Sequence, residues 1–411
     1  MKLAIDLGST SFKAGVFDGR LRQVSSSVVP TPYRRSSGGR VELEVAAVEA
    51  ALRRLIQEAR PNAIDVIAVT SQAQTFTVLD RRGLPSRPFV SWQDTRADPA
   101  CAALKKQLRC FGDHCSFGAP SPALQAAKLK HAPMKSSDQV TLTLPAYVAG
   151  VLTGDHVTDD NLAAKSGLYS LHHRDWWPAA LKACGVRRDQ LPRIVPVGSV
   201  AAETTREARR FGLPAGIPVV LAGNDQTAGA YAAALEQRRG VLLTLGTAQV
   251  AYRYASTMPQ PHSALRRGPY PGGGFYQLSA DACGANLLNW AETVLDGCND
   301  HDRLFARIAA VPRGCHGLCF DLEAGGWRDL GLHHGPSDMA RAILEALCAR
   351  MAGMVRDLRV RRDQPLLVAG GGAQRTIWRR ILSEALGRSV RRANATPLRG
   401  AARMAKEAVG R

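Results

Sequence analysis

Near its beginning the chain reads Ala-Ile-Asp-Leu-Gly-Ser-Thr-Ser-Phe-Lys (residues 4–13), and far downstream it reads Leu-Ala-Gly-Asn-Asp-Gln-Thr-Ala-Gly (residues 221–229). Each stretch is a short apolar strand that ends in a carboxylate and continues into glycine and small hydroxyl residues. Turns of this composition let backbone N–H groups approach a polyphosphate closely. Two such turns, so far apart, predict two halves that close on one nucleotide, with a carboxylate left to serve as a base.

Two more glycine turns follow, Leu-Gly-Thr-Ala at residues 245–248 and Val-Ala-Gly-Gly-Gly-Ala at residues 368–373. The second precedes an amphipathic helix, which is a suitable place for a phosphate or nucleotide. A glycine triplet is equally common in plain tight loops, so this turn alone does not decide between a phosphate-binding turn and an ordinary loop. The short similarity between residues 5–10 and 243–247 indicates an internally duplicated α/β architecture, although it is too short to prove one.

The hydrophobic pattern around these turns predicts alternating strands and helices. We expect strands at residues 3–5, 13–18, 63–70, 77–80, 89–92, 218–222, 240–245 and 366–369, a turn at Asp18-Gly19, a helix-rich segment at 99–200, and helices at 44–59, 227–235, 339–358 and 377–386. At 411 residues the chain exceeds the size at which a single core stops growing, so two domains are expected. We place the boundary near Ala233, which gives domains at 1–232 and 233–411.

Composition and charge narrow the class of protein. Hydrophobic residues make up 45% of the chain, enough for packed cores, and no apolar stretch approaches the roughly 18 residues of a membrane span. The first residues lack the pattern of a secretory signal, so we expect a cytoplasmic location. Lys and Arg outnumber Asp and Glu by 54 to 35, a net charge of +19, but the basic residues are scattered in pairs. We therefore expect affinity for anionic substrates rather than specific nucleic-acid or membrane binding.

The cysteines are odd in number and irregularly spaced, which favours reduced thiols. They are Cys101, Cys110, Cys115, Cys184, Cys283, Cys298, Cys315, Cys319 and Cys348. The groups Cys110-His114-Cys115 and Cys315-His316-Cys319 suggest a metal site, but neither has the paired Cys-x-x-Cys spacing of structural zinc. Ordinary thiols are the favoured interpretation.

Asp6 and Asp225 are the candidate chemical groups. Asp6 ends a strand before Gly8, and its carboxylate could hold a hydrated Mg²⁺ while Thr10 and Lys13 donate to phosphates. The alternative is an Asp that only caps the turn. Asp225 could orient a sugar hydroxyl and accept its proton as the oxygen attacks phosphorus. It could also cap the following helix, and the two roles are compatible.

The segment Trp-Gln-Asp-Thr-Arg at residues 92–96 places an aromatic side chain beside polar donors. Such a combination suits a polyol. A core tryptophan next to a surface ion pair is the other interpretation, and the spacing alone favours it.

Taken together and in order, eight segments resemble the FGGY family of carbohydrate kinases. They lie at residues 4–13, 91–97, 152–168, 223–226, 245–248, 325–345, 370–378 and 398–402. Residues 91–97 are similar to the family's Trp-x-Asp-x-Arg-Ala segment, and residues 223–226 match its Gly-x-Asp-Gln. The resemblance covers nearly the whole chain.

The resemblance implies an α/β fold of two actin-like (ribonuclease H-like) domains with an interdomain cleft, the sugar and the catalytic Asp in 1–232 and the nucleotide in 233–411. It implies ATP-dependent phosphorylation of a small sugar or polyol, with Asp225 as general base and ATP and Mg²⁺ as cofactors. It assigns Asp6, Gly8, Thr10, Lys13, Gly246, Thr247, Gly371, Gly372 and Ala373 to ATP, Gln74, Trp92, Asp225 and Gln226 to the sugar, and Asp6 with Asp225 to Mg²⁺.

Several positions depart from the family pattern. Ala248 stands where Ser is usual, and the Gly-Glu-Arg-x-Pro stretch expected before Gly325 is absent, so contacts in a possible homodimer would change. After Gln72, xylulose kinases usually carry Met-His and glycerol kinases Arg-Glu, whereas this chain has Ala73-Gln74. Neither pair is present, but the neutral amide of Gln74 keeps donors and acceptors for sugar hydroxyls. We expect a ketose such as xylulose rather than glycerol, because both members of the glycerol pair are absent. A catalytically weak or inactive sugar-binding regulatory protein is the alternative, and a chaperone would need a peptide-binding domain for which no residues remain.

Overall fold

The computed structural model describes residues 1–60, 63–141, 143–296 and 300–410. These residues form two compact units. Unit 1 contains residues 1–232, 255–276 and 396–411, and unit 2 contains residues 233–254 and 277–395. The predicted division was contiguous, at 1–232 and 233–411. The structure differs from it because residues 255–276 and 396–411 belong to unit 1.

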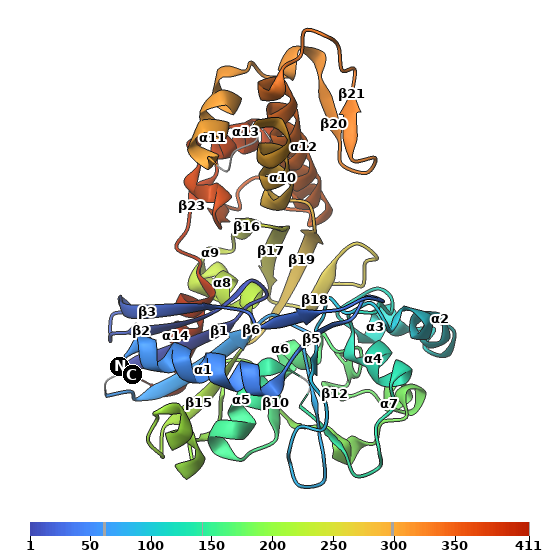
Figure 1. Cartoon of the computed structure of the whole chain (residues 1–411), viewed down its shortest axis with the longest axis vertical. Coiled ribbons are helices and arrows are strands. Elements are labelled where there is room, and N and C mark those ends of the chain that lie inside the picture. The colour runs from blue at the N-terminus through green and yellow to red at the C-terminus, as the bar shows by residue number, and fades with distance from the viewer. Residues whose placement is uncertain (61–62, 142, 297–299, 411) are drawn as a thin grey trace. The chain divides into compact units, whose positions relative to one another are not determined.

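Long-range contacts explain why these two later segments belong to unit 1. The Arg267 guanidinium donates to the carbonyl oxygens of Gly112 at 3.1 Å and Asp113 at 2.6 Å. Helix α14 (Pro397–Ala408) packs against helix α8 (Asp225–Ala232) and against strands β1 and β6 of the unit 1 sheet (Figure 1). Neither set of contacts joins residues that are close in sequence.

A six-stranded sheet lies at the centre of unit 1 and positions the candidate carboxylates. In spatial order its strands are β14 (Val200–Glu203), β15 (Pro218–Asn224), β6 (Val66–Ser71), β1 (Lys2–Leu7), β2 (Ser11–Phe17) and β3 (Gln23–Pro30). Strands β1, β6 and β15 run parallel. Their carboxyl ends therefore meet at one edge of the sheet, the edge at which parallel α/β sheets bind ligands.

The first three strands form an antiparallel meander, because each carries a suitable turn. Strand β1 is buried at every position, and the turn at residues 8–10 returns the chain into β2. At the predicted Asp18-Gly19 turn, the Asp18 carboxylate accepts the backbone N–H groups of Arg20 and Arg22 at 2.8 and 2.9 Å. That turn joins β2 to β3, so a third strand follows the two that were predicted at residues 3–5 and 13–18.

Helices and short strands complete unit 1. Helix α1 (Val45–Ala59) packs on β2 and β3 through Leu52, Leu55 and Ile56 (Figure 1). The predicted helix-rich segment contains α2 (Asp98–Gln107), α3 (Phe111–His114), α4 (Gln125–His131), α5 (Leu144–Thr153), α6 (Asp160–Ala163) and α7 (Pro178–Cys184). Two predicted strands appear as the short β7 (Val78–Leu79) and β8 (Phe89–Val90), which pair with β9 (Gln139–Val140) and β5 (Val41–Leu43).

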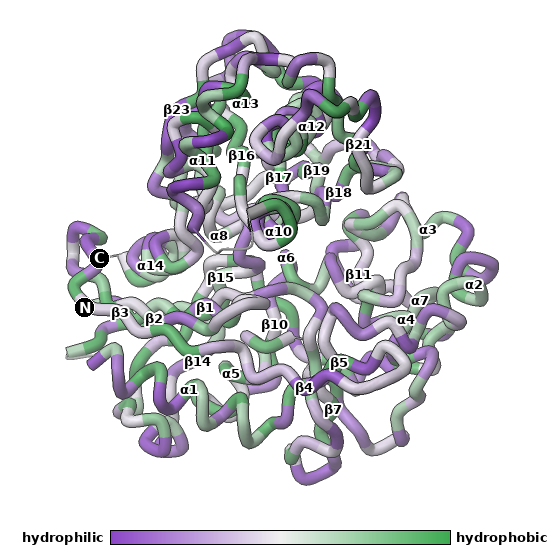
Figure 2. The backbone as a smooth tube through the Cα atoms, turned by 45° about the horizontal axis from the view of Figure 1, so that its top comes forward, coloured by the Kyte–Doolittle hydropathy of each residue, from purple (hydrophilic) through white to green (hydrophobic). Residues whose placement is uncertain are grey.

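Unit 2 is built around strands β16 (Val241–Leu245) and β22 (Leu366–Ala369), which run parallel. The sheet order there is β19 (Phe275–Asp281), β17 (Gln249–Ala255), β16, β22 and β23 (Arg391–Arg392), and the helices are α9 (Leu235–Arg238), α10 (Ala285–Asp296), α11 (His301–Ala310), α12 (Pro336–Asp357) and α13 (Thr376–Leu386). Figure 2 shows hydrophilic and hydrophobic residues alternating along α11. Its buried residues Leu304 and Ile308 are four apart, the spacing of one helix face.

The eight described cysteines form no disulfide with one another, and Cys298 lies outside the described residues. Across the described ranges, no helix combines the length and the apolar character needed to cross a membrane.

Replacing Gly400 with Val tests the packing of α14 on α8. A side chain at Gly400 would overlap the backbone of Ala228, which is already in contact. We expect Gly400→Val to lower the free energy of unfolding by about 2–3 kcal/mol, the cost typical of overpacking. Urea unfolding followed by circular dichroism measures it. Gly19→Val is the matched control, because a side chain at Gly19 meets nothing within 4 Å, and equal losses in both variants would contradict the prediction.

Candidate active site

The two candidate carboxylates lie at the carboxyl ends of parallel strands in unit 1. In the β1–β6 register Asp6 is opposite Thr70, and in the β6–β15 register Ser71 is opposite Asn224, the residue before Asp225. Only β6 separates the strands that carry the two acids. The two turns, which the sequence led us to expect in two halves closing on one nucleotide, therefore lie in the same unit and at the same sheet edge.

The Asp225 carboxylate is held by its neighbours in the chain. Its Oδ1 accepts hydrogen bonds from Asn224 Nδ2 at 2.8 Å and from the backbone N–H of Gln226 at 2.7 Å. Asn224 Nδ2 also donates to the Ser71 carbonyl at 3.2 Å, which ties the turn to strand β6. Asp225 is the first residue of α8, so the predicted capping position and the candidate base coincide.

Asn161 on α6 supports this turn from the other side. Its Oδ1 accepts the backbone N–H of Asn224 at 3.1 Å, and its Nδ2 donates to Thr227 Oγ1 at 3.1 Å and to the Pro269 carbonyl at 2.7 Å. Sequence analysis did not identify this residue as functional. Its position beside the Thr-Asp pair at 158–159 was the available signal, but the contact with Asn224 spans 63 residues.

Gly223 sets the direction in which the chain leaves strand β15. Its φ of +67° lies in the left-handed region that favours glycine. A Cβ atom there would lie 2.8 Å from Val197 Cγ2, and the Gly223 carbonyl accepts a hydrogen bond from Thr70 Oγ1 at 2.8 Å. A glycine is therefore required two residues before Asp225.

Burial dominates the electrostatics of the two acids. Burial and the negative charge of Asp225 raise the pKa of Asp6, and Lys13 partly opposes this. Burial also raises the pKa of Asp225, while hydrogen bonds from Gln226 and Asn224 and the charges of Lys165 and Lys13 lower it. Asp6 Oδ1 is buried and has no hydrogen-bond partner among the described residues. This donor set fits a divalent cation, which prefers one or two carboxylates together with phosphate oxygens.

The predicted phosphate-binding residues of unit 1 surround Asp6. Gly8 follows it, and a Cβ at Gly8 would lie 3.8 Å from Asp6 Oδ1 and 3.0 Å from the Ser11 carbonyl. Thr10 and Lys13 are exposed, and Lys13 lies opposite Asp6 in the β1–β2 register. The turn therefore carries the exposed hydroxyl of Thr10 and the exposed ammonium group of Lys13. One oxygen of Asp6, on the strand before this turn, has no hydrogen-bond partner among the described residues.

In unit 2, the remaining predicted phosphate-binding residues lie after two parallel strands. Gly246 and Thr247 follow β16, and Gly371, Gly372 and Ala373 follow β22, whose register pairs Thr244 with Ala369. Gly370 has a φ of +91°, and a Cβ there would lie 2.6 Å from the Leu245 carbonyl. The sheet thus brings the two glycine turns of unit 2 together, with Thr247 and Gly371 exposed.

The predicted sugar-binding residues occupy different environments. Gln74 is buried with a φ of +68°, and its Nε2 donates to the Lys165 carbonyl at 3.2 Å. Gln226 directly follows Asp225 and is half-buried. Trp92 is 39% exposed, so the alternative of a core tryptophan is wrong. Its ring is available as a surface for a ligand.

The ion pair beside Trp92 is only partly at the surface, because its carboxylate is buried while the Arg96 side chain is 26% exposed. Asp94 is 1% exposed and accepts hydrogen bonds from the Arg96 guanidinium at 2.7–3.0 Å and from the Val41 N–H at 3.0 Å. Lys128 Nζ donates to the Ser91 and Ala123 carbonyls at 2.6 and 2.8 Å, and burial lowers its pKa to about 7. These contacts fix the loop that carries Trp92.

Lys165 is the second residue that sequence analysis missed. It is 5% exposed, its ammonium lies 4.1 Å from the centroid of the Tyr276 ring, and it hydrogen-bonds the Tyr276 hydroxyl. Its charge lowers the pKa of Asp225. No local pattern distinguishes this lysine, because both contacts are made by residues at least 60 positions away. No cluster of three or more His, Cys, Asp or Glu side chains suited to a metal occurs within the described ranges.

Comparison with known proteins identifies the family. Residues 1–232 match the model of the N-terminal domain of the FGGY family of carbohydrate kinases, and residues 312–408 match that of its C-terminal domain. The chain therefore belongs to the FGGY family and is an ATP-dependent sugar kinase.

Individual relatives agree with this assignment. A xylulose kinase of Escherichia coli (strain K12) is 25% identical over 99% of this chain and 90% of the relative, and an L-fuculokinase of Salmonella typhi is 27% identical over 78% and 72%. A crystal structure of a xylulose kinase from Rhodospirillum rubrum superposes with a TM-score of 0.88, at 24% identity over 99% of this chain and 89% of that one. The predicted fold, two actin-like (ribonuclease H-like) α/β domains, is confirmed.

Proposed function

We propose that this kinase transfers the terminal phosphate of ATP to a hydroxyl of a small sugar or polyol, with Asp225 as the general base. One observation carries the proposal: Asp225 Oδ1 is fixed by two hydrogen bonds, and no hydrogen bond to Oδ2 is made by any described residue. That second oxygen can accept a hydrogen bond from the attacking hydroxyl. A carboxylate held this way orients the nucleophile and takes its proton late in the transfer.

The residues around Asp6 support a role in binding Mg²⁺ and phosphates. Asp6, with Asp225 beside it, would hold the cation, and Thr10 and Lys13 would face the phosphates. The cation would neutralise charge that develops on the transferred phosphoryl group. Unit 2 would contact the nucleotide through Gly246, Thr247 and the turn at 371–373, where glycine allows the backbone to approach a phosphate closely.

We further propose a ketose such as xylulose as the substrate. Two relatives that match 99% and 100% of this chain are named xylulose kinases. Gln74 uses its amide nitrogen within the protein and keeps its carbonyl oxygen for a sugar hydroxyl, and Trp92 offers an aromatic face. The relatives named above are all kinases, and they give no support to a regulatory, inactive protein. Because the reaction consumes ATP, we propose that the enzyme acts in the cytoplasm.

Asp225→Asn tests the role of the base. Asn keeps an Oδ1 that accepts from Asn224 and Gln226, so we expect the fold and ATP binding to persist. Turnover should fall by about 10²–10⁴-fold, the usual contribution of a positioned base. Coupled ADP release gives turnover, and calorimetry gives ATP affinity. Asp189→Asn, at an exposed acid paired with Arg187, is the control. A variant that retains full sugar phosphorylation would refute the role.

Lys165→Met tests the effect of the lysine charge on the pKa of Asp225. The lysine lowers the pKa of Asp225, so its loss should raise that pKa and leave less of the ionised base at low pH. We expect the acidic limb of the kcat/KM profile to move to higher pH, with a larger loss at pH 6 than at pH 8. Lys182→Met, at an exposed lysine, should leave the profile in place. A uniform loss at every pH would instead indicate a structural role.

A panel of acceptors tests the choice of sugar. We expect kcat/KM to be higher for D-xylulose than for glycerol, because Gln74 and Trp92 can contact more of the longer chain. Gln74→Ala should lower kcat/KM for D-xylulose by roughly five- to tenfold, the value of one hydrogen bond of about 1 kcal/mol. Gln57→Ala, on the exposed face of α1, is the control. Preference for glycerol, or no effect of Gln74→Ala, would contradict the assignment.

A further inference from the structure

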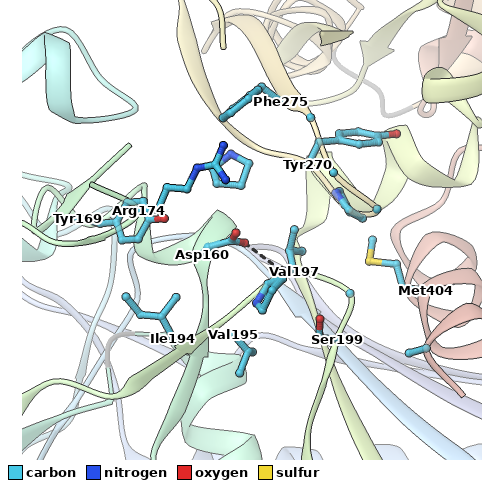
Figure 3. Close-up of a pocket in the computed structure, with 18 of the residues that line it drawn as sticks. Asp160, Tyr169, Arg174, Ile194, Val195, Val197, Ser199, Tyr270, Phe275 and Met404 are labelled. Carbon is cyan, nitrogen blue, oxygen red and sulfur yellow. Dashed lines mark hydrogen bonds between the residues drawn. The ribbon is translucent and has the colours of Figure 1, made fainter. Parts of the chain in front are cut away.

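Unit 1 contains a cavity of about 740 Å³ that the proposed reaction does not use (Figure 3). Its lining includes the segment at residues 169–175 with the nearby Asp160, the loop at residues 193–199, the hairpin turn at residues 269–275, and the end of α14 around Met404. All of these residues belong to the same compact unit. A cavity of this size accommodates a small metabolite.

One arginine in the cavity has a charge that the protein leaves unpaired. Of the three lining arginines, Arg188 pairs with Asp175 at 3.1 Å and Arg193 pairs with Asp155 at 2.6 Å. The Arg174 guanidinium forms no ion pair or hydrogen bond with any residue in the described part of the chain, and Figure 3 shows its side chain extending into the cavity. Its backbone φ of +52° is in the left-handed region, unusual for a side chain of this size.

Two polar groups beside Arg174 can bind hydroxyls. Asp160 Oδ1 accepts the backbone N–H of Val197 at 2.9 Å, drawn as the dashed line in Figure 3, which leaves the second carboxylate oxygen. Burial raises the pKa of Asp160 to about 6, and the nearby Arg174 charge opposes this. The Tyr169 hydroxyl has no partner within the described residues, although the residue is only 2% exposed. The cavity wall therefore holds an unpaired cation, an acceptor and a hydroxyl.

Aromatic side chains form the opposite wall. Tyr270 and Phe275 lie on the two sides of the hairpin turn and are labelled at the upper edge of the cavity in Figure 3. Between them lie Pro271 and the three glycines Gly272, Gly273 and Gly274, which all have positive φ, so only Pro271 of this turn adds a side chain to the cavity wall. Aromatic faces suit the C–H surfaces of a sugar, as polar groups opposite suit its hydroxyls.

We propose that this cavity is a second binding site, for a small sugar derivative with one anionic end. The anionic end, a phosphate or a carboxylate, pairs with Arg174, which can bind either group through two N–H donors. The hydroxyls are bound by Asp160 and Tyr169, and the carbon chain lies against Tyr270 and Phe275. A neutral polyol lacks the group that the guanidinium needs.

The cavity wall is also in direct contact with the residues that hold Asp225. Val197, whose N–H is bound by Asp160, packs against Gly223, where even a Cβ atom would be only 2.8 Å away. Asn161 joins the Pro269 carbonyl at the edge of the cavity to the backbone of Asn224. A ligand that shifts either wall therefore changes the position of Asp225. This consequence rests on the proposed function, whereas the binding site does not.

Hydrogen–deuterium exchange of the full chain tests the site, with glucose 6-phosphate, gluconate and sorbitol as matched six-carbon probes. We expect at least one of the two anions to slow exchange of the amides at 194–199 and 269–275, and sorbitol to have no effect there. Protection by glucose 6-phosphate alone identifies a phosphate, and protection by gluconate alone identifies a carboxylate. No protection by either anion overturns the proposal.

Arg174→Gln is the decisive variant. Calorimetry should show that it binds the anion that protects the wild-type protein at least tenfold more weakly. Arg209→Gln, at an exposed arginine outside the cavity, is the control and should bind as wild type does. Tyr169→Phe, which removes one hydroxyl, should give a smaller loss. Unchanged affinity in Arg174→Gln overturns the site. Wild-type turnover that stays constant as the anion saturates this site overturns the link to Asp225 but not the site.

Discussion

The buried Asp6 and the half-buried Asp225, two carboxylic acids at one edge of a parallel sheet, are the constraint on which the rest of this structure depends. Removing an ionised carboxylate from water is costly unless partners replace the lost hydration. Asp225 has such partners in Asn224, Gln226 and the charge of Lys165. Asp6 keeps one oxygen without any described partner. The unpartnered oxygen of Asp6 is the feature that the proposed binding of a cation and phosphates would satisfy.

The parallel sheet makes this arrangement possible, because each acid lies where a strand ends. Thr70 Oγ1 binds the Gly223 carbonyl across 153 residues, and Asn224 Nδ2 binds the Ser71 carbonyl across the same separation. Each bond joins β6 to the end of β15. The position of Asp225 relative to β1 is thus set by the sheet itself, and the turn needs only to aim the side chain. Gly223 does this with a backbone angle that other residues rarely adopt.

Sequence analysis predicted the parts of the site that depend on local pattern. Strands that end in Asp or Gly are visible as short apolar runs before a turn, so β1, β15, β16 and β22 could be placed and their turns assigned. It could not predict what long-range packing decides. Asn161 and Lys165 act on Asp225 from more than 55 residues away, and Asp94 accepts the backbone N–H of Val41, which lies 53 positions earlier in the chain. The discontinuous composition of unit 1 has the same cause, since α14 joins it through packing on α8 and β1.

The close packing around Asp225 also couples its position to the neighbouring cavity. Protein interiors are nearly incompressible, so a residue in van der Waals contact with a tightly held neighbour passes on its own displacement. Val197 contacts Gly223 on one side and lines the cavity on the other, and Asn161 bonds both Asn224 and the segment that leads to Tyr270. In its proposed role as a base, a more loosely held Asp225 would move independently of this wall and would orient the hydroxyl poorly. The packing that would let Asp225 orient a substrate therefore also makes it sensitive to whatever occupies the cavity behind Val197.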